Sequence, residues 1–584
     1  MRTPPRWLAL AGLVFVLVLE TFLVVQVANP SPHSGGDNAG YIALAYSLVD
    51  RGAYLELWEP GEPAHTKYPP GFPLVLAAMI AAGARTWTAL KASSALFTVL
   101  AVGLSFAFVR RRAGVYAALA VAVVLAFSDA LLYASQWILS DPMFLVLTLA
   151  GLVALDRVRP LGPVGSGADP PAEANSGGDA TPLARFDARW LAVGTAMALL
   201  AYFTRSAGLP LVAALVLWLA LQRRWRALAL VAVAFALPAA LWAVRSARAG
   251  APGYVSEFWM INPYDPSLGR AGPGDLITRV FENTRLYLGS AIPAGLTGRR
   301  GPMTALLGTV LAVLALVGWG RRLRRPGVVE LFAPLYLGLI LLWPVVWSGD
   351  RFALPLFPLV LLYAAEALSA GTRRLHPQAP LVVGGFAVFL LWLPGLQTWR
   401  SYAAQSELCT ERVAEGGPYG CYQPRMREFV TAARWVSVGL PEGSVVLTRK
   451  PRIFYVLSEV QSRTYPLVES ADTLLSAADA AGARYALIDY LDNLGSLYLI
   501  PSVHQHPGAF CALVGFGGDE QGIQTQLLGV QPPERRNLRG RSETVEGATS
   551  LTIRFCPEDY RRAEAPTVAP YSSPEIPLLT RLDR

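Results

Sequence analysis

The sequence has few charged residues and very little lysine. Asp, Glu, Lys and Arg make up 16% of its 584 residues, against roughly 25% in a typical soluble domain. Lysine occurs only at positions 67, 91 and 450, so nearly all of the positive charge is arginine. Hydrophobic residues make up 53%. This composition excludes a disordered chain, a collagen, a coiled coil and a purely soluble enzyme, and it indicates a polytopic membrane protein.

Motifs for nucleotides and for metals are also missing. The sequence contains no Walker A loop, no GxGxxG after a predicted strand, no HExxH and no CxxC, which argues against an ATP-driven pump. The net charge of +9 is carried by arginines that stand between apolar runs. The charge therefore indicates membrane topology and no nucleic-acid partner.

Cysteine is rare and confined to the last third of the chain. The four residues are Cys409, Cys421, Cys511 and Cys556. An even number of cysteines in one polar domain indicates an oxidising compartment, and so an extracytoplasmic domain. We expect the local pairing, 409 with 421 and 511 with 556, which is one of three possible connectivities.

Apolar runs predict about eleven transmembrane helices, with the N-terminus in the cytoplasm. The runs are 7–27, 88–109, 113–128, 142–156, 188–204, 206–221, 227–245, 303–320, 328–347, 352–370 and 379–397. The first run is about 20 residues long, which suits a retained span better than the shorter core of a signal peptide. Under this count the arginine-rich connections all fall on one side, which the positive-inside rule makes cytoplasmic.

The polar segments complete the predicted domain map of a protein of the inner (cytoplasmic) membrane. A transmembrane domain covers 1–397, an extracytoplasmic α/β domain covers 398–564, and a loose Pro-rich tail covers 565–584. Within the transmembrane domain we expect an outer loop with interfacial helices at 28–87, a flexible cytoplasmic linker at 157–187 and a second outer loop at 246–302. Residues 72–84 are apolar but too short to span, which favours an interfacial or re-entrant piece.

Two aspartates stand at predicted helix starts on the outer face. Asp37 precedes a segment in which apolar residues, beginning with Tyr41, recur at helical spacing, as in a short helix lying in the membrane interface. Asp141 precedes Pro142. Each carboxylate has a structural alternative, because aspartate commonly caps a helix N-terminus.

Three cations also lie on the outer face. Lys67 and Tyr68 precede two prolines in a stretch that predicts a rigid, extended loop. Arg205 lies at the turn between two spans, and Arg351 follows Asp350 at the start of another. Charges at membrane depth usually face a cavity or a partner. The alternatives are snorkelling to lipid headgroups or a local pair with Asp350.

Other polar or aromatic residues carry weaker signals. Glu20 lies inside the first span, where an acid is by default a functional candidate but can also reach water near the end of the helix. Trp259 and Tyr264 have the character of sugar-stacking residues, although an aromatic belt at the membrane interface is the commoner explanation.

In their order along the chain, these segments resemble the GT-C membrane glycosyltransferases, which include protein O-mannosyltransferases and bacterial aminoarabinose transferases of lipid A. The resemblance covers roughly residues 1–400. The motifs that carry it are Asp37, Lys67-Tyr68-Pro69-Pro70, Asp141-Pro142, Thr204-Arg205 and Arg351…Leu354-Pro355…Pro358. The family often has a second acid beside the first aspartate, where this chain has Asn38. That difference argues against a carboxylate pair or a bound metal at this point.

The resemblance implies transfer of a sugar from a polyprenyl-phosphate donor to an acceptor hydroxyl, with inversion at the anomeric carbon. It makes Asp37 the general base and gives Asp141 the task of orienting a cation or the acceptor. Lys67, Arg205 and Arg351 would bind the donor phosphate. The residues that would line the substrate path are Tyr41, Tyr68, Trp259, Tyr264 and Glu20. No metal ligand is assigned, and a divalent metal cofactor stays an open alternative.

The expected partners are the lipid-linked donor, membrane lipids and a glycan, lipid or protein acceptor. Two other functions remain open from the sequence. One is a transporter or flippase for a lipid-linked glycan, against which the missing internal repeat counts. The other is a non-catalytic membrane assembly protein.

Overall fold

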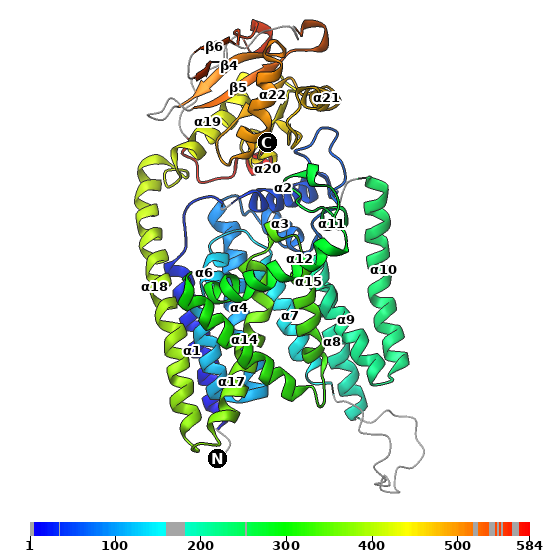
Figure 1. The fold of residues 1–584 in the computed structure, drawn as a ribbon, viewed down its shortest axis with the longest axis vertical. Coiled ribbons are helices and arrows are strands. Elements are labelled where there is room, and N and C mark those ends of the chain that lie inside the picture. The colour runs from blue at the N-terminus through cyan, green and yellow to red at the C-terminus, as the bar shows by residue number, and fades with distance from the viewer. Residues whose placement is uncertain are drawn as a thin grey trace.

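The structure is a computed structural model that describes residues 5–33, 35–158, 182–250, 254–517, 524–536, 543–545, 548–550, 553–562 and 571–583. A long helical bundle forms one part, and a smaller domain with a β-sheet sits on one end of it (Figure 1). The N-terminus lies at the opposite end of the bundle (Figure 1). The chain is thus a polytopic α-helical membrane protein with an α/β domain near its C-terminus.

Each predicted apolar run lies on a helix. The helices are α1 (Arg6–Gln26), α4 (Trp87–Ala113), α5 (Val115–Ala126), α7 (Asp141–Leu155), α8 (Pro182–Thr204), α9 (Leu209–Leu221), α10 (Trp225–Ala249), α14 (Pro302–Arg322), α15 (Val328–Leu342), α17 (Phe357–Thr372) and α18 (Ala379–Gly416). Among the described residues six helices are long and apolar enough to cross a membrane alone, and the pair α5 and α6 (Asp129–Ser135), bent by 59°, gives a seventh. Eleven spans therefore remain a prediction, because several of these helices are short.

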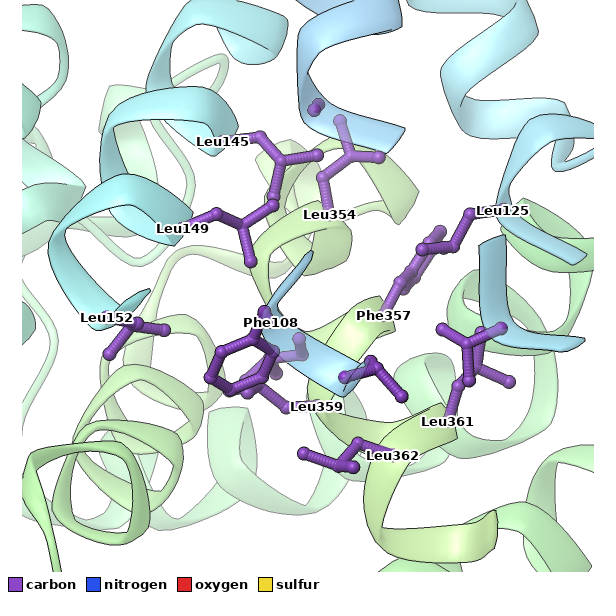
Figure 2. Close-up of a cluster of buried hydrophobic side chains, with 14 of the residues drawn as sticks. Phe108, Leu125, Leu145, Leu149, Leu152, Leu354, Phe357, Leu359, Leu361 and Leu362 are labelled. Carbon is purple, nitrogen blue, oxygen red and sulfur yellow. The ribbon is translucent and has the colours of Figure 1, made fainter. Parts of the chain in front are cut away.

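The bundle is held together by interlocked aliphatic and aromatic side chains. Phe108 of α4, Leu149 of α7 and Phe357 of α17 meet in its centre (Figure 2). Phe108 and Phe357 are fully buried, and Leu125 of α5 packs into the same cluster. Close packing of this kind fixes which helix ends meet on the outer face.

Arginines from separate connections meet at the end of the bundle far from the C-terminal domain. Arg112, at the end of α4, pairs with Asp156 at 2.8 Å and with Glu330 of α15 at 2.5 Å. Arg322 of α14 pairs with Glu366 of α17. The 27 residues of α4 span about 40 Å, and its first residues lie near the C-terminal segment, where Ile576 donates a backbone hydrogen bond to Arg85. This grouping is what the positive-inside pattern predicts.

Two short helices, α2 (Gly36–Asp50) and α3 (Gly71–Ala81), lie between the bundle and the C-terminal domain (Figure 1). The prediction of an amphipathic surface helix is wrong for α2, because every residue from Asn38 to Ser47 is buried. The neighbouring helix α3 packs on α2, and α20 (Pro451–Ser458) packs on it from the C-terminal domain. With 11 residues, α3 measures about 16 Å and is too short to cross a bilayer.

The second outer segment is mostly helical. It contains α11 (Tyr254–Phe258), α12 (Pro273–Leu286) and α13 (Ile292–Thr297), so 246–302 is not an irregular loop. The predicted linker at 157–187 lies largely outside the described residues, and α8 begins within it at Pro182.

The C-terminal domain contains a mixed five-stranded sheet in the order β2-β1-β3-β5-β4. The strands are β1 (Val445–Leu447), β2 (Gln461–Arg463), β3 (Tyr485–Ile488), β4 (Phe510–Phe516) and β5 (Thr525–Val530). The first three are parallel, and β5 is antiparallel to both of its neighbours. The helices include α19 (Pro424–Gly439), α20, α21 (Ala471–Ala481) and α22 (Ile500–Gln505). A short pair, β6 (Glu543–Val545) and β7 (Ala548–Ser550), completes the domain. Helices and strands therefore alternate along much of this domain, as in an α/β fold.

Both disulfides follow the local pairing expected from the sequence. Cys409 is bonded to Cys421 and Cys511 to Cys556. Cys409 lies on α18, which continues without a break past the predicted domain boundary at 397 into polar sequence. The first bond therefore ties this helix to the segment that leads into the C-terminal domain.

The prediction of a loose tail is wrong for 571–583. Ile576, Leu578 and Leu579 are fully buried. Leu578 and Leu579 belong to η10 (Pro577–Asp583), which directly follows Ile576 and packs against α20 and α2. Burial of these three apolar side chains explains the docking, since the prolines set the backbone and do not prevent burial.

Candidate active site

Asp37 lies in the first turn of α2, at the boundary between the bundle and the C-terminal domain. Gly35 is the residue that precedes the helix, and no side chain caps it. The Asp37 carboxylate instead accepts a hydrogen bond from the Tyr68 hydroxyl at 3.0 Å and lies 3.3 Å from Arg351. The alternative interpretation of Asp37 as a helix cap is therefore wrong.

Asp141 occupies the corresponding place on α7 and also does not cap its helix, which follows Ser140. One carboxylate oxygen of Asp141 accepts from Arg205 at 2.7 Å and the other from Arg351 at 2.9 Å. Arg351 therefore bridges the two aspartates, which are more than a hundred positions apart in the sequence.

Four structural elements converge to build this cluster. Arg205 lies between α8 and the short η1 (Ser206–Gly208), and Arg351 lies on α16 (Asp350–Ala353). The Ser140 hydroxyl contacts both Arg205, at 3.2 Å, and the Tyr41 hydroxyl, at 2.9 Å. These bonds orient the guanidinium groups before any ligand arrives. The structure thus brings six of the predicted site residues together: Asp37, Asp141, Arg205, Arg351, Tyr41 and Tyr68.

The two carboxylates differ in accessibility. The side chain of Asp37 is 38% exposed and that of Asp141 only 2%. Both oxygens of Asp141 are occupied by arginines, whereas Asp37 retains acceptor capacity and an open approach. Only Asp37 can therefore meet an incoming hydroxyl.

The charges around Asp37 keep it ionised. Burial by itself would raise the pKa of Asp37, but Arg351, Arg452, the Tyr68 hydroxyl and Arg205 hold that pKa below its ordinary value. Burial raises the pKa of the Tyr68 phenol far above its usual range, so Tyr68 stays protonated and can donate. Asp37 is thus a carboxylate at neutral pH.

One member of the cluster was not among the residues predicted from the sequence. Arg452, the second residue of α20, donates a hydrogen bond of 2.6 Å to the Tyr68 hydroxyl. Its guanidinium also lies over the rings of Trp58, at 5.3 Å, and Tyr68, at 5.0 Å. A signal was present, because Arg449, Lys450 and Arg452 follow the apolar residues of strand β1, and the segments after parallel strands often bind ligands. Nothing in the sequence, however, placed that strand next to Tyr68.

The structure does not bring Lys67 into the cluster. Its ammonium pairs with Glu257 of α11 at 2.7 Å and lies 5.4 Å from the Tyr254 ring and 5.0 Å from the Trp347 ring. To reach a phosphate on Arg351, Lys67 would have to leave this pair. The other predicted lining residues lie elsewhere, and among them Trp259 and Tyr264 are partly exposed at the outer surface. Glu20 is fully buried in α1, with no hydrogen bond to either carboxylate oxygen.

The donor set does not fit a divalent metal. Within the part of the chain that the structure describes, no group of three or more His, Cys, Asp or Glu is placed to hold one. The two aspartates already share Arg351, and Asn38 accepts a hydrogen bond of 3.0 Å from the backbone of Ile138. Asp141 and Asn38 are therefore committed to arginines and to the main chain, and Asp37 alone of the three keeps acceptor capacity.

Comparison with known proteins shows a likeness in fold and none in sequence. No protein-family model matches the chain, and no curated protein sequence matches it. Among solved structures, the apo oligosaccharyltransferase of Archaeoglobus fulgidus is similar over 88% of this chain and 74% of its own, with 14% identity and a TM-score of 0.52. ArnT from Cupriavidus metallidurans, bound to undecaprenyl phosphate, is similar over 88% of this chain and 97% of its own, with 14% identity and a TM-score of 0.51. The chain therefore shares its overall fold with these two proteins.

Proposed function

We propose that this GT-C-fold protein transfers a sugar from a polyprenyl-phosphate donor to an acceptor hydroxyl at the outer face of the cytoplasmic membrane. The observation that carries the proposal is the chain of contacts from Asp37 through Arg351 to Asp141 and Arg205. It sets one accessible carboxylate beside two oriented guanidinium groups. A base next to a phosphate site is what such a transfer requires.

The charge of the cluster matches that of the donor. Arg205, Arg351 and Arg452 with Asp37 and Asp141 leave one net positive charge. A polyprenyl-phosphate sugar is a phosphodiester with one negative charge, and its phosphate gains a second when the sugar leaves. Cations aimed at charge that develops in the transition state stabilise it more than they stabilise the ground state. Arginine suits this task because its planar fork binds two phosphate oxygens.

In the proposed step the acceptor hydroxyl gives its proton to Oδ2 of Asp37, the oxygen that lies 3.3 Å from Arg351. The acceptor oxygen forms a bond to the anomeric carbon while the bond from that carbon to the phosphate oxygen breaks. The electron pair of the broken bond goes to the phosphate, which leaves as a stable anion and needs no general acid. A single displacement inverts the anomeric configuration. Asp37 then loses its proton to water.

Asp141 has a positioning role in this scheme. Because both of its oxygens accept from arginines and its side chain is buried, it cannot contact the acceptor. It holds Arg205 and Arg351 at the spacing that a phosphate would bridge. Lys67 and its partner Glu257 lie beside the aromatic residues Tyr254 and Trp347, where they could receive a donor before it reaches the cluster.

The test uses purified protein in lipid nanodiscs with a panel of polyprenyl-phosphate sugars, and it measures release of free polyprenyl phosphate. Asp37→Asn should abolish release, because loss of a general base costs about 10²–10⁴-fold. Asp50→Asn is the matched control, since this exposed carboxylate lies at the other end of the same helix, where it pairs with Arg51. Equal release by the wild type and Asp37→Asn would remove Asp37 from the mechanism.

The competing hypotheses give different results in the same assay. A transporter or flippase of lipid-linked glycans would bind a donor without releasing polyprenyl phosphate, and Asp37→Asn would not change the bound state. A non-catalytic assembly protein would neither bind nor cleave any donor. Either outcome, obtained with acceptors present, would contradict the proposed transfer.

A further inference from the structure

We infer that the C-terminal domain completes the active site by supplying Arg452 as a positioning residue for the base. The inference rests on the proposed function insofar as it treats Asp37 as that base. It assigns a task to a domain whose sequence carries no motif. The contact itself, from Arg452 to Tyr68 to Asp37, is a property of the structure and does not depend on the substrate.

The fold brings Arg452 to the site by a close fit between two helices. Pro451 begins α20, so the Arg452 side chain leaves the first turn of a helix that packs directly on α2. On α2 the facing residue is Gly40, where an added Cβ would lie 3.0 Å from the Cδ of Arg452. The absence of a side chain at Gly40 lets the arginine pass between the helices toward Tyr68.

The hydrogen-bond chain has a defined direction. A guanidinium can only donate, so the Tyr68 oxygen must accept from Arg452. The single proton of the Tyr68 hydroxyl is then free to point at Asp37, whose oxygen accepts it at 3.0 Å. Arg452 therefore sets the orientation of a group that touches the base. The second oxygen of Asp37 is left for Arg351 and the acceptor.

The electrostatic setting of Asp37 comes from both parts of the protein. The bundle contributes two cations, Arg351 and Arg205, and a second negative charge, Asp141. The outer segment contributes the hydroxyl groups of Tyr68 and Tyr41. Arg452 is the cation that comes from the C-terminal domain. Without Arg452, Asp37 would lose a nearby positive charge and an ordered hydrogen bond, and it would take up a proton at a higher pH.

The experiment compares Arg452→Gln, Arg452→Lys and the control Arg463→Gln. Arg463 lies on β2, next to α20, and pairs with Glu59 of the outer segment at 3.3 Å. The Arg463→Gln substitution therefore removes a contact between the C-terminal domain and the outer segment, and it leaves the hydrogen bonds from Arg452 through Tyr68 to Asp37 in place. Release of polyprenyl phosphate is measured as a function of pH. Protonation of Asp37 is measured separately, by mass spectrometry of its pH-dependent modification by a water-soluble carbodiimide, which reacts with the protonated carboxyl.

Arg452→Gln should lower release at neutral pH by about 10- to 100-fold, a share of what a general base contributes. It should also move both the acidic limb of the rate and the modification of Asp37 to higher pH. Arg452→Lys should restore part of the activity, and Arg463→Gln should behave like the wild type in both assays. In the background of Tyr68→Phe, Arg452→Gln should have a much smaller effect, because the relay is already broken.

Two results would overturn the inference. One is an unchanged pH dependence of Asp37 modification in Arg452→Gln. The other is an effect of Arg452→Gln that is fully additive with Tyr68→Phe. A shift in Asp37 modification without turnover of any donor would instead contradict the proposed function and leave the positioning role supported. Thermal unfolding of each variant identifies a protein that has failed to fold. If Arg452→Gln fails to fold, Arg452→Lys is compared with the wild type in its place.

Discussion

Arg351 is the residue on which the proposed site depends most. Its guanidinium donates to Asp37 and to Asp141, so it links the accessible carboxylate to the buried one. Arginine suits this link because its rigid planar guanidinium presents several donors in fixed directions. The sequence analysis predicted that Arg351 binds the donor phosphate, and it left open the alternative that Arg351 pairs with Asp350. The backbone N–H of Arg351 does contact Asp350, at 3.0 Å, but its guanidinium turns to the other two aspartates.

Arg351→Gln should lower phosphate release by about 10²–10³-fold, the usual cost of removing one group that stabilises developing charge. It should also weaken binding of polyprenyl phosphate itself, since the lipid presents the same phosphate. Binding to nanodiscs and single-turnover release measure the two effects. Arg299→Gln is the control, because Arg299 is exposed and bonded to Gln397. Equal losses in both variants would assign the effect to general surface charge.

The acid dependence of the reaction follows from the low pKa of Asp37. Burial opposes ionisation, but the surrounding cations and Tyr68 outweigh it and lower the pKa below the ordinary aspartate value. The Asp37 carboxylate is therefore present at pH 7 and at pH 5, and protonation removes it only below the ordinary titration range of aspartate. A rate profile of phosphate release should be flat over that interval on its acidic side. An acidic limb centred near pH 6 would point to a different base.

At the scale of elements, the site depends on close approach between helix ends. Gly71 begins α3 directly after the Tyr68-Pro69-Pro70 turn, and an added Cβ there would lie 2.7 Å from the backbone oxygen of Phe203 and 2.9 Å from the Thr204 hydroxyl. The end of α8, and with it Arg205, is thus held against the loop that carries Tyr68. Glycine is required here by space and not by backbone angle.

Gly71→Ala should therefore push α3 away from α8 and disturb both Tyr68 and Arg205. Overpacking of this kind costs about 1–3 kcal/mol, which would appear as a lower Tm together with reduced release. Gly338→Ala, in the middle of α15, is the control, because an added Cβ there meets nothing within 4 Å. A Gly71→Ala protein with the stability and activity of the wild type would show that α3 moves freely at this contact.

At the scale of the whole molecule, the two disulfides and the arginine pattern make the same prediction about sidedness. Both disulfides belong to the C-terminal end, and the arginine network of Arg112 and Arg322 lies at the opposite end of the bundle. An oxidising compartment on one side and positive charge on the other predict that the site lies on the extracytoplasmic face.

Single-cysteine labelling in intact cells tests this orientation. The disulfides account for all four native cysteines, so an introduced thiol is the only reactive one. Ser267→Cys, in the exposed turn before α12, should react with a membrane-impermeant maleimide, whereas Arg324→Cys, after α14, should react only once the cells are opened. The reverse pattern would put the site in the cytoplasm and exclude the proposed class of donor.

The sequence by itself determined the membrane character, the positions of the apolar helices, the disulfide pairing and most of the charged residues of the site. These features are local: a backbone in hydrocarbon must bond within its own helix, and arginines mark helix ends. Only the tertiary structure decided what each charge faces. It buried α2 on all sides, docked the tail through Ile576, turned Lys67 to Glu257 and brought Arg452 to Tyr68 from 384 positions away. Such pairings depend on how helices pack across the whole chain, and no local pattern records that packing.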